Sequence, residues 1–163
     1  MEGAPGPAAT GGQRIYTLGH SSRTEEELLR ILRARGIRYV VDVRRFPGSR
    51  RSPQFSREHL EQVLARHQLI YLGMGRKLGG FRKEGYETHL ASDTFRQGIG
   101  ELEETARKGP AAILCAEALW FRCHRRLIAD ELARRGWEVV HILSEERDMA
   151  HPRPRSDEAE PPP

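Results

Sequence analysis

Hydrophobic positions along the chain alternate between strand-like and helix-like patterns. Short runs rich in β-branched and aromatic residues predict five strands, at residues 15–18, 37–43, 69–72, 111–114 and 137–143. Apolar residues three and four positions apart predict helices between them, at residues 25–35, 57–67, 94–108 and 122–135. Strands that alternate with helices favour a parallel sheet, because each parallel connection must cross over the sheet. We therefore predict an α/β fold, a single domain with a five-stranded, mainly parallel sheet and flanking helices.

Polar residues at the helix ends support this pattern. Thr24, with a glutamate three residues later, has the form of a capping box. Ser56 and Asp93 are the predicted N-caps of the next two helices. Residues 73–85, rich in Gly, Lys and Arg, are predicted to be a loop.

The two ends of the chain have a different composition from the middle. Residues 1–12 are mostly Gly, Pro and Ala, and residues 147–163 hold five of the ten prolines. Neither segment has enough apolar surface to offset its ordering entropy. We predict a disordered N-terminal segment (1–12), a single α/β domain (13–146) and a disordered, Pro-rich acidic tail (147–163).

The positive charge of the chain is concentrated in the predicted domain. Of the 27 basic residues, 24 are Arg. Residues 13–143 carry a net charge of +8, whereas the segment from residue 144 onward is acidic. Such a basic domain suits an anionic ligand, either a nucleotide or nucleic acid. A genome rich in GC codons would produce the same excess of arginine.

The sequence contains no signal for a membrane or for secretion. No run approaches the roughly 20 apolar residues of a membrane span, and the first residues lack the basic and apolar regions of a signal peptide. Two cysteines, Cys115 and Cys123, are too few for a disulfide scaffold. We therefore expect a cytoplasmic, reduced protein, and the sequence leaves its oligomeric state open.

Reactive residue types follow several of the predicted strands. His20 follows the first strand, and Asp42 lies near the end of the second. Cys115 and Glu117 follow the fourth. The carboxyl ends of parallel strands share one edge, where α/β proteins bind ligands, so these residues are expected to gather there. Glu117 and Asp42 are the predicted acid and base, with His20 or His124 assisting.

Several of these residues also have a purely structural interpretation. An aspartate in a buried strand is costly unless it is paired, and Arg44 is the predicted partner, two residues later on the same side. Cys115 directly follows an apolar strand, where a cysteine is often inert packing. His20 can serve simply to cap a turn.

A second reactive cluster begins the last predicted helix. Cys123 and His124 occupy its expected first turn, where free N–H groups lower a thiol pKa and attract anions. Arg122 and Arg125 would add bidentate contacts to phosphate or carboxylate. Cys115 and Arg122 are spaced almost like the Cys-x5-Arg loop of Cys-dependent phosphatases and the cysteine loop of rhodaneses, with one residue too many.

The usual metal and nucleotide motifs are absent from the sequence. The spacing of Cys115, Cys123 and His124 is not a usual arrangement of zinc ligands. Neither a GxGxxG fingerprint nor a Walker loop is present. We therefore predict no metal and no cofactor.

The loop over residues 44–57 is the clearest basic feature of the sequence. It holds five arginines, among them Arg50 and Arg51, interleaved with two phenylalanines. Arginine with aromatic rings suits backbone phosphates and stacked bases, and the alternative is a solvated surface loop. A second basic cluster, over residues 76–83, follows the third strand. If both loops lie over one sheet edge, the mouth of the site is basic.

Three segments of the sequence together resemble a known family. TLGHSSRTEEELLRIL, VVDVRRFPGSRRSPQF and LCAEALWFRCHRRLIADEL are similar to the family catalogued as domain of unknown function 488, over about residues 15–142. The family is biochemically uncharacterised, and the resemblance implies at most a connection with nucleic acid. Its signature positions in this sequence are Gly19, His20, Asp42, Arg44, Phe46, Pro47, Cys115, Glu117, Cys123, His124 and Arg125.

We therefore expect an enzyme that acts on nucleic acid or a nucleotide. It would be hydrolase-like, with acid/base carboxylates and with Arg44, Arg122 and Arg125 holding phosphate. One alternative is a non-catalytic nucleic-acid-binding module that reads phosphate through the two basic loops. The other is a Cys-dependent phosphatase or sulfurtransferase-like enzyme.

Overall fold

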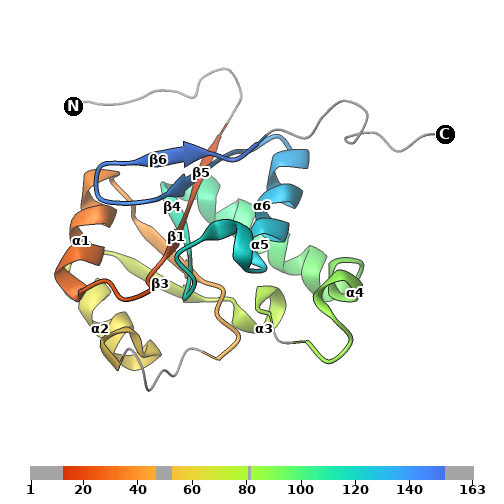
Figure 1. The fold of residues 1–163 in the computed structure, drawn as a ribbon, viewed down its shortest axis with the longest axis horizontal. Coiled ribbons are helices and arrows are strands. Elements are labelled where there is room, and N and C mark those ends of the chain that lie inside the picture. Colours follow the sequence, from red (N-terminus) through yellow and green to blue (C-terminus); the bar gives the residue numbers. More distant parts are fainter. Residues whose placement is uncertain (1–12, 47–52, 81, 153–163) are drawn as a thin grey trace.

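The computed structural model describes residues 13–46, 53–80 and 82–152. Within these residues six strands form one sheet, in the order β3-β2-β4-β1-β5-β6 (Figure 1). The strands are β1 (Arg14–Gly19), β2 (Tyr39–Asp42), β3 (Ile70–Gly73), β4 (Ala111–Cys115), β5 (Glu138–Ile142) and β6 (Asp148–Ala150). β1 to β5 are parallel, and β6 pairs antiparallel with β5. The predicted single α/β domain with a mainly parallel sheet is confirmed, with six strands instead of five.

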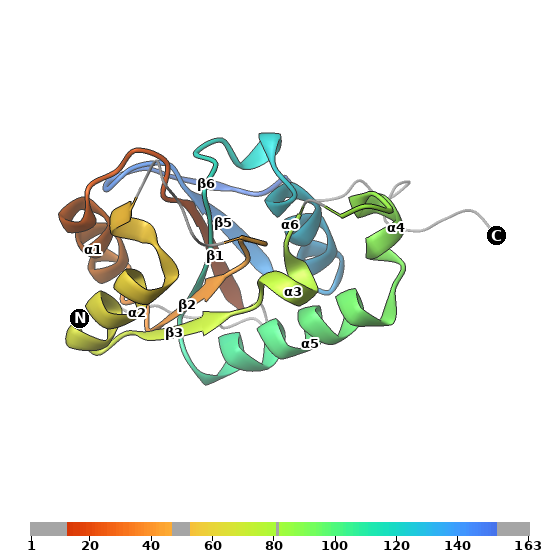
Figure 2. The ribbon, with the colours of Figure 1, turned by 90° about the horizontal axis from the view of Figure 1, so that it is seen from below.

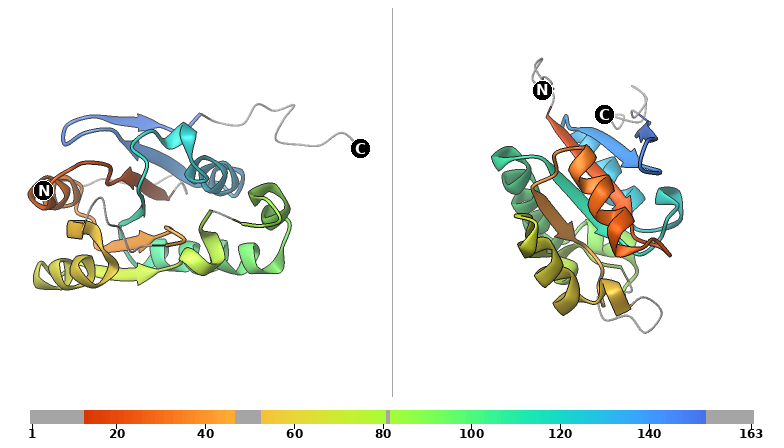
Figure 3. Two further views of the ribbon diagram at one scale, coloured as in Figure 1. Left: turned by 60° about the horizontal axis from the view of Figure 1, so that its bottom comes forward. Right: turned by 90° about the vertical axis from the view of Figure 1, so that its left-hand side faces the viewer.

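Helices cover both faces of the sheet (Figures 2 and 3). They are α1 (Glu25–Ala34), α2 (Arg57–Arg66), α3 (Gly75–Leu78), α4 (Tyr86–Leu90), α5 (Asp93–Lys108) and α6 (Arg125–Arg134), with 3-10 turns η1 (Pro53–Phe55) and η2 (Trp120–Arg122). The apolar side chains of α1 and α2 pack on one face of the sheet. Those of α3, α5 and α6 pack on the other. None of the helices described is long and apolar enough to cross a membrane.

The helix caps agree with the sequence in part. The Thr24 hydroxyl accepts the N–H of Glu27 at 3.1 Å, as the capping box predicts. Ser56 precedes α2 as predicted, although its side chain makes no cap hydrogen bond. The N-cap of α5 is Ser92, whose hydroxyl accepts the N–H of Phe95 at 3.1 Å. The prediction of Asp93 as that cap was wrong by one residue.

Two connections are more ordered than predicted. The segment predicted as a loop over residues 73–85 contains α3, and α4 begins directly after it. A helix of four residues is too short to leave a periodic pattern in the sequence. The last helix begins at Arg125 and not at Arg122, and residues 120–122 form the 3-10 turn η2. The prediction that Cys123 and His124 occupy the first turn of this helix was therefore wrong, because His124 is its N-cap and Cys123 precedes the cap.

The segment predicted as a disordered tail begins with a strand. β6 pairs Ala150 with Val140, and the N–H of His151 donates to the Val139 carbonyl at 2.8 Å. Three exposed residues at a sheet edge give no hydrophobic alternation, so the sequence pattern missed them. Residues 1–12 and 153–163, the remainder of the predicted disordered segments, lie outside the described residues.

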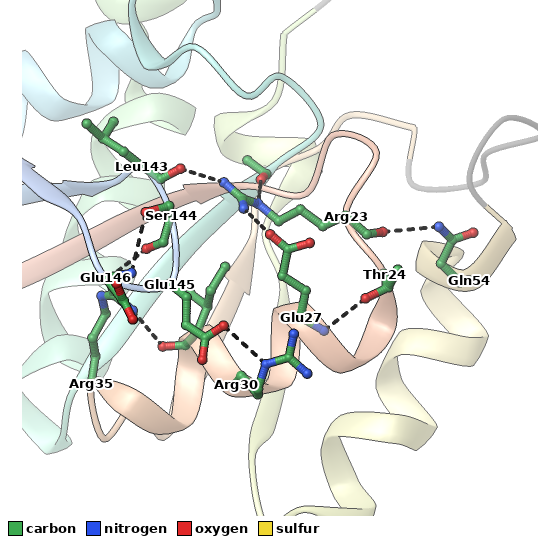
Figure 4. Close-up of polar contacts among 12 residues, drawn as sticks. Arg23, Thr24, Glu27, Arg30, Arg35, Gln54, Leu143, Ser144, Glu145 and Glu146 are labelled. Atoms are coloured by element: carbon green, nitrogen blue, oxygen red, sulfur yellow. Dashed lines mark hydrogen bonds and ion pairs between the residues drawn. The ribbon is translucent and has the colours of Figure 1, made fainter.

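Arg23 joins the carboxyl ends of two strands to α1 (Figure 4). Its guanidinium donates to the carbonyls of Gly19 and Leu143, each at 3.0 Å. It also forms an ion pair with the Glu27 carboxylate at 2.8 Å, and its side chain is 12% exposed. These contacts fix the turn after β1, which carries His20.

Candidate functional site

Asp42 and Arg44 form a buried ion pair at the end of β2. Arg44 Nη2 donates to Asp42 Oδ2 at 2.7 Å and Nε donates to Oδ1 at 2.8 Å. The backbone N–H of Arg44 adds a third bond to Oδ1 at 3.0 Å, and the Tyr71 hydroxyl donates to Oδ2. Asp42 is 1% exposed and Arg44 7%. The predicted pairing of these two residues is confirmed.

His20 and Phe55 contact the Arg44 guanidinium of this ion pair. His20 Nδ1 lies 3.1 Å from the Ser21 carbonyl, which can only accept, so Nδ1 carries the proton. Its Nε2 therefore accepts from Arg44 Nη1 at 3.3 Å, and that nitrogen also donates to the Phe55 carbonyl at 2.7 Å. Burial lowers the pKa of His20, and the Arg44 charge lowers it further, so the ring is neutral at pH 7.

These contacts assign Asp42 and Arg44 a positioning role. A carboxylate offers about four lone-pair sites, and four donors occupy those of Asp42. No lone pair is left for the base that the sequence predicted. Arg44 likewise directs its N–H groups at Asp42, Phe55 and His20, which does not fit its predicted role as a phosphate ligand.

Cys115 and Cys123 meet on the opposite face of the sheet. Both cysteines are free thiols, and their sulfur atoms lie 3.4 Å apart. Cys115 ends β4 and is buried, whereas Cys123 is half-buried shortly before α6. Hydrogen bonding from Cys115, together with the Arg125 charge, lowers the pKa of Cys123 to about 6. The same hydrogen bond and burial raise the pKa of Cys115 well above its ordinary value.

Arg125 lies beside this thiol pair and is 1% exposed. Its Nη2 donates to the carbonyls of Glu117 and Ala118 at 3.0 and 3.2 Å. Its Nε and Nη1 are buried and have no hydrogen-bond partner among the described residues. The backbone N–H of Arg125 donates to Cys123 Sγ at 3.3 Å. Among the described residues, no carboxylate forms an ion pair with this guanidinium, and its charge lowers the pKa of Cys123.

The remaining predicted site residues are less closely joined. Glu117 is exposed, and its carboxylate accepts the N–H of Leu119 at 3.2 Å. His124 Nε2 donates to the Val43 carbonyl at 3.2 Å, and burial lowers the His124 pKa to about 4. Arg122 is exposed at the end of η2. No contact among the described residues joins the Asp42 and Glu117 carboxylates.

Arg50, Arg51 and Pro47 lie outside the described residues. Phe46 is described, and its ring is 67% exposed beside the Arg45 guanidinium. In the described part of the chain, no three His, Cys, Asp or Glu side chains are grouped so as to hold a metal ion.

A backbone hydrogen bond joins the cluster around Asp42, Arg44 and His20 to the cysteine pair. The N–H of His20 donates to the Cys115 carbonyl at 2.8 Å, which extends the pairing of β1 with β4. A Cβ atom on Gly19 would lie 1.9 Å from the Glu117 carbonyl oxygen, so glycine is needed for this close approach. His20, Asp42 and Cys115 therefore lie at one edge of the sheet, as predicted. Cys115 packs into the core on the α5 and α6 face, whereas His20 packs against Phe55 on the α1 and α2 face.

A hollow of about 340 Å³ opens at the carboxyl ends of β2 and β3. β2 leads to α2 on one face of the sheet, and β3 leads to α3 and α5 on the other. Ligands of α/β proteins bind where connections diverge in this way. The charged side chains that line the hollow are Asp42, Arg44, Arg45, Arg57, Arg76, Lys77 and Glu101. We call this site the basic hollow.

Both acidic residues of the basic hollow are already paired. Asp42 binds Arg44, and Glu101 forms an ion pair with Lys77. Among the described residues, no carboxylate pairs with Arg45, Arg57 or Arg76. The described parts of the two basic loops thus line one hollow, through Arg45 and Arg57 of the first loop and Arg76 and Lys77 of the second. The sequence did not single out these three arginines within their loops, because loop composition does not show which cations are paired.

Sequence reasoning also missed a buried chain of polar side chains on the α6 face. Thr17 Oγ1 lies 2.6 Å from His141 Nδ1, and His141 Nε2 lies 2.8 Å from His151 Nδ1. His151 Nε2 donates to Asp130 Oδ1 at 2.7 Å. The Trp120 ring stacks on His141 with 4.2 Å between centroids. Burial lowers the pKa of His141 to about 3, so its ring in this chain is neutral.

The fold and site define an α/β protein with a basic, ligand-sized hollow at the carboxyl ends of parallel strands. The family model described as domain of unknown function DUF488 matches residues 24–132, about two thirds of the chain. The chain belongs to this family. The match covers Asp42, Cys115 and Cys123 and begins after His20. No curated protein and no solved structure matches the chain.

Proposed function

We propose that this protein binds the phosphate groups of a nucleotide, free or within a single strand, in the basic hollow. The observation that carries this proposal is the set of three arginines, Arg45, Arg57 and Arg76, around the hollow without a carboxylate partner among the described residues. Arginine presents a rigid fork of N–H donors that matches the oxygen atoms of phosphate.

The size of the hollow supports a small ligand. Its volume of about 340 Å³ lies at the lower end of the range for small-molecule sites, which is roughly 300–1,000 Å³. This is room for one nucleotide unit and too little for a duplex. A single strand would place one of its nucleotides in the hollow.

Buried and crowded positive charge supports an anionic ligand. Arg45 Nε is buried and has no hydrogen-bond partner among the described residues. A buried donor without a partner costs about 1–3 kcal/mol, which a ligand oxygen would recover. Burial and the nearby Arg45 charge lower the pKa of Arg82. A phosphate beside Arg45 would relieve this repulsion.

Binding is the part of the predicted function that the geometry favours. Hydrolysis by an Asp42 and Glu117 pair has no comparable support, because the Asp42 carboxylate is occupied by Arg44 and Tyr71. We therefore propose a nucleotide-binding protein and assign the two carboxylates no catalytic role.

Fluorescence anisotropy with a labelled single-stranded pentanucleotide tests the proposal. Arg57→Gln and Arg76→Gln should each weaken binding roughly tenfold, because each removes a charged hydrogen bond. Arg66→Gln is the matched control, because Arg66 is exposed at the other end of α2, about 14 Å from Arg57 at 1.5 Å per residue. It should bind like the wild type.

Competition identifies the form of the ligand. Displacement of the pentanucleotide by a nucleoside triphosphate, but not by inorganic triphosphate, would show that the hollow takes a whole nucleotide. Displacement by both would show recognition of phosphate alone. Equal binding by the wild type, the two hollow variants and the Arg66 control would refute the proposal, as would no binding at low salt.

A further inference from the structure

We propose that Cys115 and Cys123 form a reactive dithiol, which a hydroperoxide oxidises to an intramolecular disulfide with Cys123 as the attacking thiolate. This site lies on the α5 and α6 face of the sheet and does not depend on nucleotide binding in the basic hollow.

The geometry places the two sulfur atoms close to bonding distance. They lie 3.4 Å apart, and a disulfide bond of about 2.05 Å requires them to approach by a little over 1 Å. Cys115 is fixed in the central strand β4, whereas Cys123 lies in the connection between η2 and α6. A small shift of that connection closes the distance. Cys123 is also the more exposed of the two thiols.

Arg125 is the reason to expect a thiolate here. Its guanidinium is buried, and its Nε and Nη1 have no hydrogen-bond partner in the described part of the chain. A buried charge is strongly unfavourable unless an opposite charge compensates it. The Arg125 charge lowers the pKa of Cys123. A Cys123 thiolate supplies the missing negative charge and also accepts the Arg125 backbone N–H.

The neighbouring titratable groups reinforce this assignment. Cys115, on β4, has a raised pKa and stays protonated. Its sulfur lies 3.4 Å from Cys123 Sγ and 3.5 Å from the Glu117 carbonyl oxygen, so its S–H can donate to a Cys123 thiolate. Tyr86, on α4, is half-buried, and both this burial and the Cys123 charge raise its pKa, so its ring stays neutral. His124 and His141 are neutral at pH 7, because burial lowers their pKa values. Arg125 is therefore the cation that faces the pair from α6.

The proposed oxidation takes place in two steps. The Cys123 thiolate attacks one oxygen of the hydroperoxide, so an S–O bond forms, the O–O bond breaks, and the alkoxide leaves and takes a proton from water. The Cys115 sulfur then attacks the Cys123 sulfenic acid, so an S–S bond forms and the S–O bond breaks. The leaving hydroxide takes the Cys115 proton as water. Two thiols are oxidised, and one hydroperoxide is reduced to an alcohol and water.

Mass spectrometry of the intact chain treated with hydrogen peroxide tests the proposal. The chain contains two cysteines in all, so the product is unambiguous. The wild type should lose the mass of two hydrogen atoms, remain monomeric on a non-reducing gel, and recover its mass with dithiothreitol. Cys115→Ala should stop at a sulfenic acid that dimedone traps at Cys123. Cys123→Ala should resist oxidation under the same conditions.

The alkylation of wild-type protein by iodoacetamide gives a second, independent readout. At pH 5.5 folded Cys123 should react roughly tenfold faster than the same cysteine in the urea-unfolded chain, because more of it is thiolate, although each thiolate is less nucleophilic. The rate should have a midpoint near the pKa of about 6. Cys115→Ala should raise that midpoint, because the hydrogen-bond donor is lost.

Three results would overturn the proposal. The first is oxidation of the Cys123→Ala variant as fast as the wild type. The second is a wild-type product that is an intermolecular dimer or a stable sulfenic acid. The third is an alkylation midpoint at the ordinary thiol pKa. None of these results bears on the basic hollow, so failure of the dithiol proposal leaves nucleotide binding untouched.

Discussion

Replacing Asp42 with Asn tests whether this carboxylate holds the site together. The substitution keeps the shape of the side chain but removes the charge that compensates Arg44, which is 7% exposed. Breaking a buried ion pair by removing one partner costs about 3–5 kcal/mol. The new amide N–H₂ would also face the donors of Arg44 and Tyr71 that now bind Asp42. At about 2–4 °C per kcal/mol for a chain of this size, the melting temperature should fall by roughly 6–20 °C.

Urea denaturation followed by circular dichroism measures this loss. Asp93→Asn is the matched control, because Asp93 also pairs with an arginine but its side chain is 87% exposed. A surface pair of this kind contributes less than about 1 kcal/mol, so the control should unfold close to the wild type. A free energy of unfolding for Asp42→Asn within about 1 kcal/mol of the wild type would refute the positioning role, since breaking a buried ion pair costs more than this.

Two further predictions concern stability. The unfolded chain binds protons to His124 and His141 at about pH 6.5, whereas the folded pKa values are about 4 and 3. Each histidine should therefore lower the free energy of unfolding by about 2 kcal/mol as the pH falls from 8 to 5. Urea midpoints that do not fall over this pH range would contradict these pKa values. Gly19→Ala should destabilise by about 1–3 kcal/mol through collision with the Glu117 carbonyl, whereas Gly100→Ala, with open space around it, should stabilise by about 0.5–1 kcal/mol. Equal urea midpoints for these two variants would contradict the close approach at Gly19.

The sequence predicted most of the fold because its elements carry strong local signals. The run around Val40 and Val41 is apolar and β-branched, and it forms β2, an interior strand of the sheet. The cap at Thr24 is likewise local, since donor and acceptor lie three residues apart. β6 and α3 carried no such signal, because β6 is three exposed residues and α3 is a helix of four residues.

The sequence predicted the candidate site only in part. It placed residues at the ends of strands, but it did not predict most contacts between their side chains. Residues two positions apart along a strand project to the same side, and this alternation predicted the pairing of Asp42 with Arg44. It could not show that Tyr71, from β3, fills the last lone pair of that carboxylate. It also could not show that Cys115 and Cys123 meet across a seven-residue connection, since that depends on how the connection folds back onto β4.

The salt dependence of pentanucleotide binding tests the central claim most directly. Contacts from three arginines to a single strand predict that log Kd rises with log salt concentration with a slope of about 2. The double variant Arg57→Gln with Arg76→Gln should bind more weakly and retain a slope of about 0.7. An equal slope and affinity for the wild type and the double variant would show that the arginines of the basic hollow do not hold the phosphate groups.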